Sequence, residues 1–244
     1  YIKSSIFSTD ILLNNVAITM YAKCGSIREA RRVFDCMERR DEISWNEIIS
    51  AYLQHGCHDD AFKIVEEMIQ QIVKPDIVAI TMMINTCIKL KDLCKCKKVH
   101  SFIMTGGFKS NISVLNNILD MYIKCGNVKD ALEVFTMLKL RDIVSWSAMI
   151  AGFAQHGDYD MAFRCFAHMQ QEGFQPNEVT FLVALNACSR IGQFTKGQQY
   201  FESMKTEYGM CPTLEHHTCI MDLLVRSGQL DNAEAMIEKM PFSS

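Results

Sequence analysis

The sequence predicts an all-α protein, an α-solenoid built from helix-turn-helix repeats in a single array covering residues 1–244. The chain repeats itself with a shift of 101 residues, and the recurring marks are Trp45 and Trp146, Tyr21 and Tyr122, Cys24-Gly25 and Cys125-Gly126, His55-Gly56 and His156-Gly157, Pro75 and Pro176. Each long period divides into segments of 31, 35 and 35 or 36 residues. Short fixed periods are typical of arrays whose units bury their apolar faces on one another rather than in one common core.

The first ten residues are predicted to be the tail of a unit. The units that follow cover residues 11–41, 42–76, 77–111, 112–142, 143–177, 178–213 and 214–244. Each is expected to form two amphipathic helices, because apolar residues recur at helical spacing on both sides of a break, as in 43–54 and 58–71 around Gly56. The break recurs at Gly25, Gly126, Gly157, Gly192 and Gly228.

A small residue is expected at one fixed place early in each second helix. The residues at this place are Ala30, Ala61, Cys96, Ala131, Ala162, Gly197 and Ala233. Cysteine and glycine stand in two units where the others have alanine, so the requirement is small size. We interpret it as the closest approach between the helices.

Composition is typical of a packed helical protein, with 49% hydrophobic and 22% charged residues, 4 Pro and 12 Gly. No apolar run is long enough to span a bilayer, so no membrane contact is predicted. The net charge is −3, which argues against general affinity for nucleic acid. Because the chain begins in mid-repeat, we expect it to be a fragment whose targeting segment would lie upstream.

The 11 cysteines recur as repeat positions, for example Cys24 with Cys125 and Cys87 with Cys188. Their odd number and apolar surroundings favour packing in a reducing compartment. Three clusters have metal-like composition: His55, Cys57 and His58; Cys94, Cys96 and His100; His216, His217 and Cys219. None has the paired spacing of a tetrahedral zinc site, so neither a metal nor another cofactor is predicted.

Three runs carry a family resemblance: NVAITMYAKCG at 15–25, and the whole segments 42–76 and 143–177. They resemble plant pentatricopeptide repeats of the PLS subclass, with units in the order S, P, L, S, P, L, S after the tail of an L repeat. The last two units resemble the L and S repeats that precede C-terminal E and DYW extensions. The resemblance implies a right-handed α-solenoid that binds single-stranded RNA, one base per repeat.

The family reads each base with one residue in the first helix and the last residue of the repeat. The resemblance therefore implies the pairs Asn15 with Asp41, Asn46 with Asp76, Thr81 with Asn111, Asn116 with Asp142, and Ser147 with Asn177. All ten are polar, and a polar side chain in a tight helical array needs surface exposure or a partner.

The chemistry of the pairs suggests their preferences. An ionised Asp only accepts hydrogen bonds and suits uracil N3–H, whereas Asn can also donate to the bare ring nitrogen of adenine. The Asn/Asp pairs are therefore expected to prefer U, the Ser/Asn pair A, and the Thr81/Asn111 pair weakly A. In the sixth unit Leu182 and Thr213 occupy the two places, and no base readout is expected there.

Two further sets complete the predicted site. The residues three places before the base-reading residue of each first helix are expected to sandwich the base. They are Leu12, Ile43, Val78, Val144 and Val179, and Ser113 breaks the aliphatic series. Basic residues near the end of the first helix are expected to contact phosphates: Lys23, Lys89, Lys124, Arg190 and Arg226, with Gln54 and Gln155 in the two P units. The alternative for the basic set is a solvated helix end, where cations favour the dipole.

Two rival functions remain at the level of sequence. A tetratricopeptide-like protein-interaction solenoid has a similar helix pair, but it requires neither the 31/35/35 cycle nor a terminal Asp or Asn. A zinc deaminase would need the H-x-E and P-C-x-x-C strings, and neither occurs in this sequence, so no catalysis is predicted.

The resulting hypothesis is a monomeric single-stranded RNA-binding array of a mitochondrial or chloroplast protein. It would be the site-recognition part of a C-to-U editing factor, with the deaminase downstream in the full chain or in a partner protein of the editing complex. The alternative within the same class is RNA stabilisation or splicing support.

Overall fold

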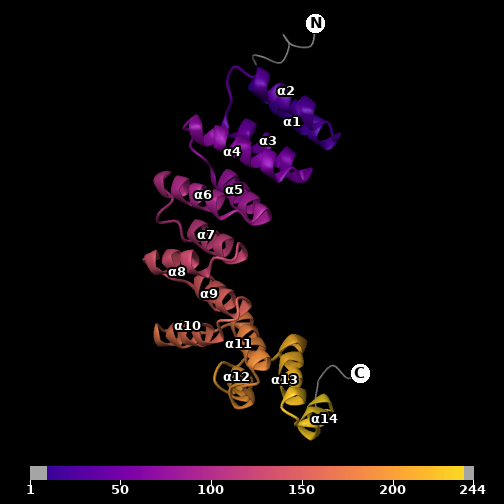
Figure 1. The fold of residues 1–244 in the computed structure, drawn as a ribbon, viewed down its shortest axis with the longest axis vertical. Helices are drawn as coiled ribbons and strands as arrows, with labels where there is room; N and C mark the ends of the chain where they lie inside the picture. Colours follow the sequence, from indigo (N-terminus) through magenta and orange to yellow (C-terminus); the bar gives the residue numbers. More distant parts are fainter. Residues whose placement is uncertain (1–9, 239–244) are drawn as a thin grey trace. The chain divides into compact units, whose positions relative to one another are not determined.

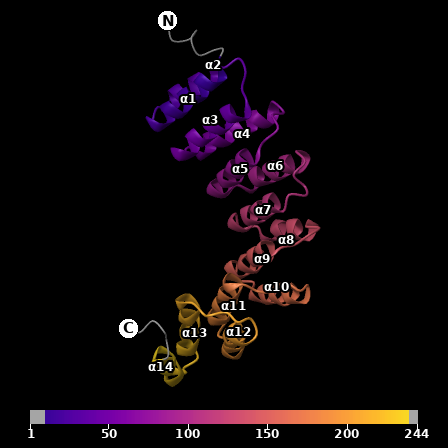
Figure 2. The ribbon, with the colours of Figure 1, turned by 180° about the vertical axis from the view of Figure 1, so that it is seen from behind.

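The computed structural model describes residues 10–238, and within them every regular element is an α-helix (Figure 1, Figure 2). The predicted tail at 1–10 and the last unit at 214–244 therefore lie partly outside the described residues. The helices are α1 (Ile11–Lys23), α2 (Ile27–Cys36), α3 (Glu42–Gln54), α4 (His58–Gln70), α5 (Ile77–Leu90), α6 (Leu93–Thr105), α7 (Ile112–Lys124), α8 (Val128–Met137), α9 (Ile143–Gln155), α10 (Tyr159–Gln171), α11 (Glu178–Ile191), α12 (Phe194–Thr206), α13 (Leu214–Arg226) and α14 (Leu230–Glu238).

The chain forms two compact units, Tyr1–Asp130 and Ala131–Ser244, with α8 crossing the boundary between them. In the first unit the odd-numbered helices α1, α3, α5 and α7 pack on one another in chain order. In the second unit α9, α11 and α13 do the same. Except for α8, which crosses the boundary, each even-numbered helix packs on the odd-numbered helix before it, and most also contact the one after it (Figure 1). This arrangement confirms the predicted all-α helical repeat solenoid.

The turns within the helix pairs show why glycine recurs there. The chain leaves the first helix of most pairs through a residue with positive φ, for example Gly56 at 72° and Gly157 at 81°. A residue with a Cβ adopts this left-handed conformation only at a cost. In the third pair Lys91 takes the position as the C-cap of α5, with φ at 51°.

The small residues early in the second helices are buried, as the size rule requires. Ala30, Ala61, Cys96 and Ala131 are completely inaccessible to solvent. A Cβ added to Gly197 would overlap Leu223 Cδ2 on α13 and would lie 3.2 Å from the Cβ of Cys188 on α11. Glycine therefore stands where three helices meet most closely.

An aromatic and arginine cluster repeats in both units. The rings of Phe34 and Trp45 meet edge to face at 4.8 Å between centroids, and the Arg40 guanidinium lies 4.6 Å from the Phe34 ring. The equivalent residues 101 positions later, Phe135, Trp146 and Arg141, are arranged in the same way at 4.8 and 4.9 Å. Such ring pairs contribute about 0.5 to 1.5 kcal/mol beyond their burial. They join the end of one predicted repeat to the start of the next.

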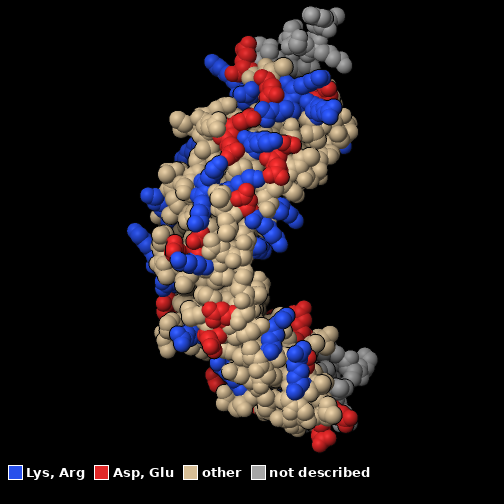
Figure 3. Space-filling model, in the orientation of Figure 1, with Lys and Arg blue, Asp and Glu red and all other residues tan. Residues whose placement is uncertain are grey.

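Ion pairs link the second helices of the first unit. Arg31 of α2 binds Glu67 of α4 at 2.9 Å, and Lys98 of α6 binds Glu66 of α4 at 2.7 Å. Figure 3 shows blue and red side chains interspersed over the visible face of this unit. Because these pairs are partly exposed, each stabilises the fold by only about 0 to 1 kcal/mol.

No helix in the described part of the chain combines the length and apolarity needed to cross a bilayer.

Candidate nucleic-acid interface

The last residue of each of the first six predicted repeats is the N-cap of the next odd-numbered helix. Asp41, Asp76, Asn111, Asp142, Asn177 and Thr213 hold this place at the starts of α3, α5, α7, α9, α11 and α13. A capping side chain accepts hydrogen bonds from backbone N–H groups that the helix leaves unpaired. Helix capping thus provides a structural reason for Asp or Asn at these positions, which the sequence analysis did not identify.

In the first unit the structure brings two predicted base-reading pairs together. Asn15 on α1 donates from Nδ2 to Oδ1 of Asp41 at 3.2 Å. Asn46 on α3 donates from Nδ2 to Oδ2 of Asp76 at 3.0 Å. In both cases a side chain in the middle of one first helix meets the cap of the next, so the two residues form one polar group between adjacent helices.

Hydrogen bonding also fixes the charge state of Asp41. Burial of the carboxyl would raise its pKa, but bonds from the Ser44 hydroxyl, the Ser44 N–H and the Asn15 amide outweigh burial and lower the pKa below its ordinary value of 3.8. Ser44 Oγ and N each lie 2.7 Å from Asp41 Oδ1. The group therefore remains an ionised acceptor at neutral pH.

In the second unit Ser147 and Asn177 are joined through a third side chain. Ser147 Oγ on α9 lies 3.3 Å from Oγ1 of Thr180 on α11. Thr180 Oγ1 in turn donates to Asn177 Oδ1 at 2.6 Å. Thr180 was not among the residues predicted from the sequence, although its reciprocal hydrogen bonds with Asn177 form a capping box.

The predicted pair of Thr81 and Asn111 does not come together. Thr81 donates from Oγ1 to the Ile77 carbonyl at 2.8 Å, and Asn111 accepts from Val114 N at 3.2 Å. Within the described residues, no hydrogen bond joins Thr81 to Asn111. Asn116 lies on α7 and Asp142 caps α9, in the other compact unit, so this pair remains a prediction. Leu182 is half-buried on α11.

The aliphatic residues predicted to sandwich bases are exposed, and all of them lie in the first turn of a first helix. Their accessible fractions range from 55 to 73%, and they are Leu12, Ile43, Val78, Val144 and Val179. Ser113 is also exposed. An exposed aliphatic residue at one repeated position thus gives α1, α3, α5, α9 and α11 a small apolar surface in the first turn.

The five predicted phosphate contacts are all exposed but differ in their neighbours. Lys124 pairs with Asp120 at 2.7 Å, and Arg226 pairs with Asp222 at 2.8 Å. No carboxylate in the described part of the chain lies within ion-pair distance of the other three, which are Lys23, Lys89 and Arg190. Arg190 borders a hollow of about 350 Å³ between α9 and α11, together with Gln155 and Asn186.

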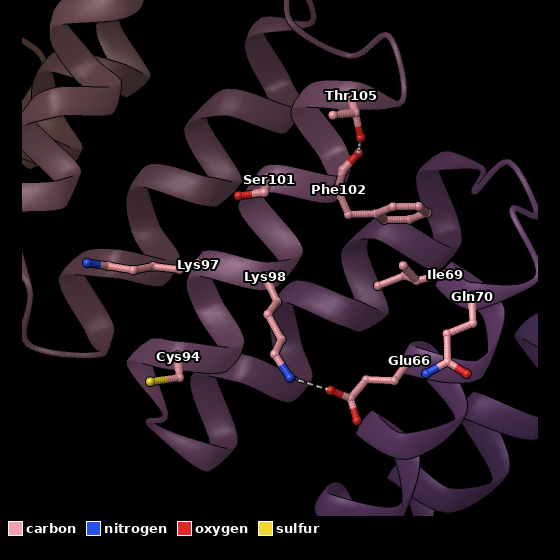
Figure 4. A pocket seen from close by; sticks show the side chains of 9 residues that line it. All are labelled: Glu66, Ile69, Gln70, Cys94, Lys97, Lys98, Ser101, Phe102 and Thr105. Carbon is pink, nitrogen blue, oxygen red and sulfur yellow. Dashed lines mark hydrogen bonds and ion pairs between the residues drawn. The ribbon is translucent and has the colours of Figure 1, made fainter.

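A larger hollow of about 610 Å³ lies between α4 and α6. Figure 4 shows Glu66 and Ile69 facing Lys98 and Phe102 across it, with an ion pair between Lys98 and Glu66. None of the predicted RNA-contacting residues lines it. It belongs to the second helices, whereas the polar pairs, aliphatic residues and cations all belong to the first helices or their caps.

The described residues hold no group of three or more His, Cys, Asp or Glu side chains placed to bind a metal ion. Cys96 and Cys125 lie 3.5 Å apart through their Sγ atoms. Burial raises the pKa of Cys125 to about 12, and a hydrogen bond with Cys87 together with burial raises the pKa of Cys96. Both thiols are therefore protonated at neutral pH.

The fold and the site together define an α-helical repeat protein with paired polar residues at the junctions between repeats. A family model described as "PPR repeat family" matches residues 40–89 and 141–190. A second model, described as "PPR repeat", matches residues 15–41, 113–143, 179–208 and 215–243. The chain belongs to the pentatricopeptide repeat family.

Relatives in Arabidopsis thaliana support this assignment. The putative pentatricopeptide repeat-containing protein At3g23330 is 38% identical over 98% of this chain and 34% of its own length. The chloroplastic protein At4g35130 is 35% identical over 97% of this chain and 29% of its own length, and the putative mitochondrial protein At3g11460 is 37% identical over 96% and 37%. The chain thus spans about a third of the length of the curated relatives that it matches.

Solved structures agree on the fold. The crystal structure of the pentatricopeptide repeat protein PPR10 in complex with an 18-nt psaJ RNA element matches with a TM-score of 0.56 and 16% identity, over 96% of this chain and 40% of that one. The structure of PPR10 from maize matches with a TM-score of 0.51 and 18% identity, over 95% and 44%.

Proposed function

We infer that this chain binds single-stranded RNA in a sequence-specific manner, one base per repeat. The observation that carries the inference is the Asn46–Asp76 hydrogen bond, because it joins two side chains that the family resemblance selects as one reading pair. An exposed aliphatic residue, Ile43, lies one helical turn before Asn46. Membership in the pentatricopeptide repeat family and the RNA bound by PPR10 support the same function.

The charge distribution favours directed contacts over general affinity. With a net charge of −3, the protein lacks the basic excess of nonspecific nucleic-acid binders. The exposed cations at the ends of first helices would hold phosphates, and the polar groups between the helices would select bases. Base stacking on small aliphatic surfaces would complete each contact.

The test is selection from a random pool of single-stranded RNA. The expected order along the enriched RNA is U, U, weak A, U, A, followed by two positions with little preference. The matched control is the Asn46→Ala variant, which should lose the preference for U at the second position and keep the rest. Enrichment without this order, or equal binding to duplex RNA, would reject the function.

For the biological role, the proposal is target recognition in organellar C-to-U editing, with the deaminase elsewhere in the full protein or in a partner. Chloroplastic and mitochondrial names among the relatives support an organellar location. Sequencing organellar transcripts from a plant that lacks the protein should show loss of C-to-U conversion at a site beside the selected sequence. Normal editing with reduced abundance or splicing of a transcript would instead support the stabilisation or splicing alternative.

A further inference from the structure

Thr180 is a buried hydroxyl residue that contacts both members of a proposed reading pair. Its side chain is completely inaccessible to solvent. Its Oγ1 atom lies 2.6 Å from Asn177 Oδ1 and 3.3 Å from Ser147 Oγ, and it accepts a hydrogen bond from Asn177 N at 3.1 Å. The Thr180 backbone N–H also donates to Asn177 Oδ1, at 2.9 Å.

These contacts determine which atoms of Asn177 remain available. An amide oxygen has two lone pairs, and an amide nitrogen has two hydrogens. The Thr180 N–H can only donate, so its partner on Asn177 must be the oxygen, which fixes the orientation of the amide. With the N–H and the hydroxyl both donating to it, Asn177 Oδ1 is saturated, and only the Nδ2 group can address a further partner.

We propose that Thr180 is a positioning residue that makes Asn177 a pure hydrogen-bond donor toward RNA, so that this repeat accepts adenine and rejects uracil and guanine. The inference rests on the proposed RNA-binding function. Adenine N1 is an acceptor and suits the Nδ2 group, whereas uracil N3–H and guanine N1–H are donors and need a free lone pair. Because Asn177 Oδ1 is saturated, it has no lone pair left to accept a hydrogen bond from uracil N3–H or guanine N1–H.

Equivalent positions elsewhere in the chain provide an internal comparison. Asn111 caps α7 by accepting a hydrogen bond from Val114 N at 3.2 Å. Because valine has no hydroxyl to donate a second bond, Asn111 Oδ1 keeps one lone pair. Asp76 is followed by Ala79 at the place of Thr180, and Ala79 supplies only its backbone N–H. A carboxylate has several acceptor sites, so Asp76 remains an acceptor whatever follows it. A hydroxyl matters only beside a terminal Asn.

The proposal is tested by measuring the affinity of the 244-residue chain for four RNAs that differ only in the base at the fifth position. Wild type should favour A over U and over G. Thr180→Val should bind the U and G targets more tightly with little change for A, and reduce the A-to-U ratio at least about 5-fold, the lower end of the cost of an opposed polar group. Thr180→Ser keeps the hydroxyl and should retain the wild-type ratio.

A second variant tests the same mechanism by gain of function in the first unit. Val114→Thr adds a hydroxyl next to Asn111 and should sharpen the weak preference for A at the third position by a similar factor. Ala79→Thr is the control, because Asp76 retains free acceptor sites, and it should leave the preference for U unchanged. These variants alter different repeats, so a folding defect in one does not affect the test in the other.

The two possible failures are distinguishable. Absence of a preference for A at the fifth position in wild type would reject the proposed register and function. A wild-type preference for A that survives in Thr180→Val, or an equal loss of affinity for all four targets, would reject the role of Thr180 alone. In the second case Thr180 is a capping residue and nothing more.

Discussion

The amide Nδ2 of Asn46 donates a 3.0 Å hydrogen bond to Oδ2 of Asp76, across 30 residues of sequence. The bond is possible because Asp76 caps α5 through Oδ1, which accepts from Ala79 N at 2.7 Å and leaves the second oxygen free. Capping therefore fixes the direction of the carboxylate before any RNA binds. The Oδ1 atom of Asn46 is buried and has no hydrogen-bond partner among the described residues.

An exchange of reading residues should change the selected base. The double variant Ser147→Asn with Asn177→Asp reproduces the Asn46/Asp76 pair in the second P unit. Asp would place an acceptor against adenine N1 but would match uracil N3–H, and an opposed polar group costs about 1 to 3 kcal/mol, or roughly 5- to 150-fold in affinity. The variant should prefer U over A at the fifth position in a binding assay. Equal weakening of both RNAs would return these residues to a packing role.

The salt dependence of RNA binding should distinguish free cations from paired ones. If all five cations neutralise a phosphate, log K against log salt should fall with a slope of about −3.5. Lys23→Ala should flatten the slope by about 0.7, whereas Lys124→Ala should change it less, because Lys124 already pairs with Asp120 at 2.7 Å. Base preference should be unchanged in both variants. Identical slopes for wild type and Lys23→Ala would mean that Lys23 is only a solvated helix end.

Ile72 should be a site of stabilising substitution. Its φ is 55°, a left-handed conformation that is costly for a β-branched residue, and 88% of the residue is exposed, so little burial would be lost. The equivalent residue 101 positions later is Gly173, with φ at 84°. Ile72→Gly should raise the free energy of unfolding by about 0.5 to 1 kcal/mol, after the entropic cost of glycine.

Thermal unfolding with refolding checks should show this as an increase in Tm. Gly173→Ala is the matched control and should lower Tm, because alanine must adopt the same positive φ. If Ile72→Gly lowers Tm instead, the Ile72 side chain makes a stabilising contact that outweighs the backbone strain.

Asp41 should contribute to stability in a pH-dependent manner. Its pKa is lower in the folded protein than its ordinary value of 3.8, so the contribution is present above that value and is lost as pH falls through the lower folded pKa. Asp41→Asn keeps the capping oxygen but cannot ionise. Urea unfolding from pH 7 down to pH 3 and below should therefore show a smaller loss of stability for the variant. Parallel losses in the two proteins would contradict the shift.

Local pattern was sufficient to predict much of the fold. Helical spacing of apolar residues, glycine at the turns and a small residue at each close approach of helices follow from backbone geometry and steric size, which act over a few residues. The pair of helices on either side of Gly56 is therefore found where the sequence placed it, to within one residue at the helix ends. The internal period also made the solenoid architecture recognisable without any structure.

The sequence by itself determined the helix pairs, the repeat length and the residue types at the junctions. Only the tertiary structure decided which side chains meet there, because Ser147, Asn177 and Thr180 come from two helices packed side by side. The pairing of Lys124 with Asp120 is local, because residues four apart are neighbours on a helix, and the structure shows that this ion pair forms. The hydrogen bonds from Thr180 to Asn177 are local, but the contact between Ser147 and Thr180 joins residues 33 positions apart, and periodicity carries no information about that distance.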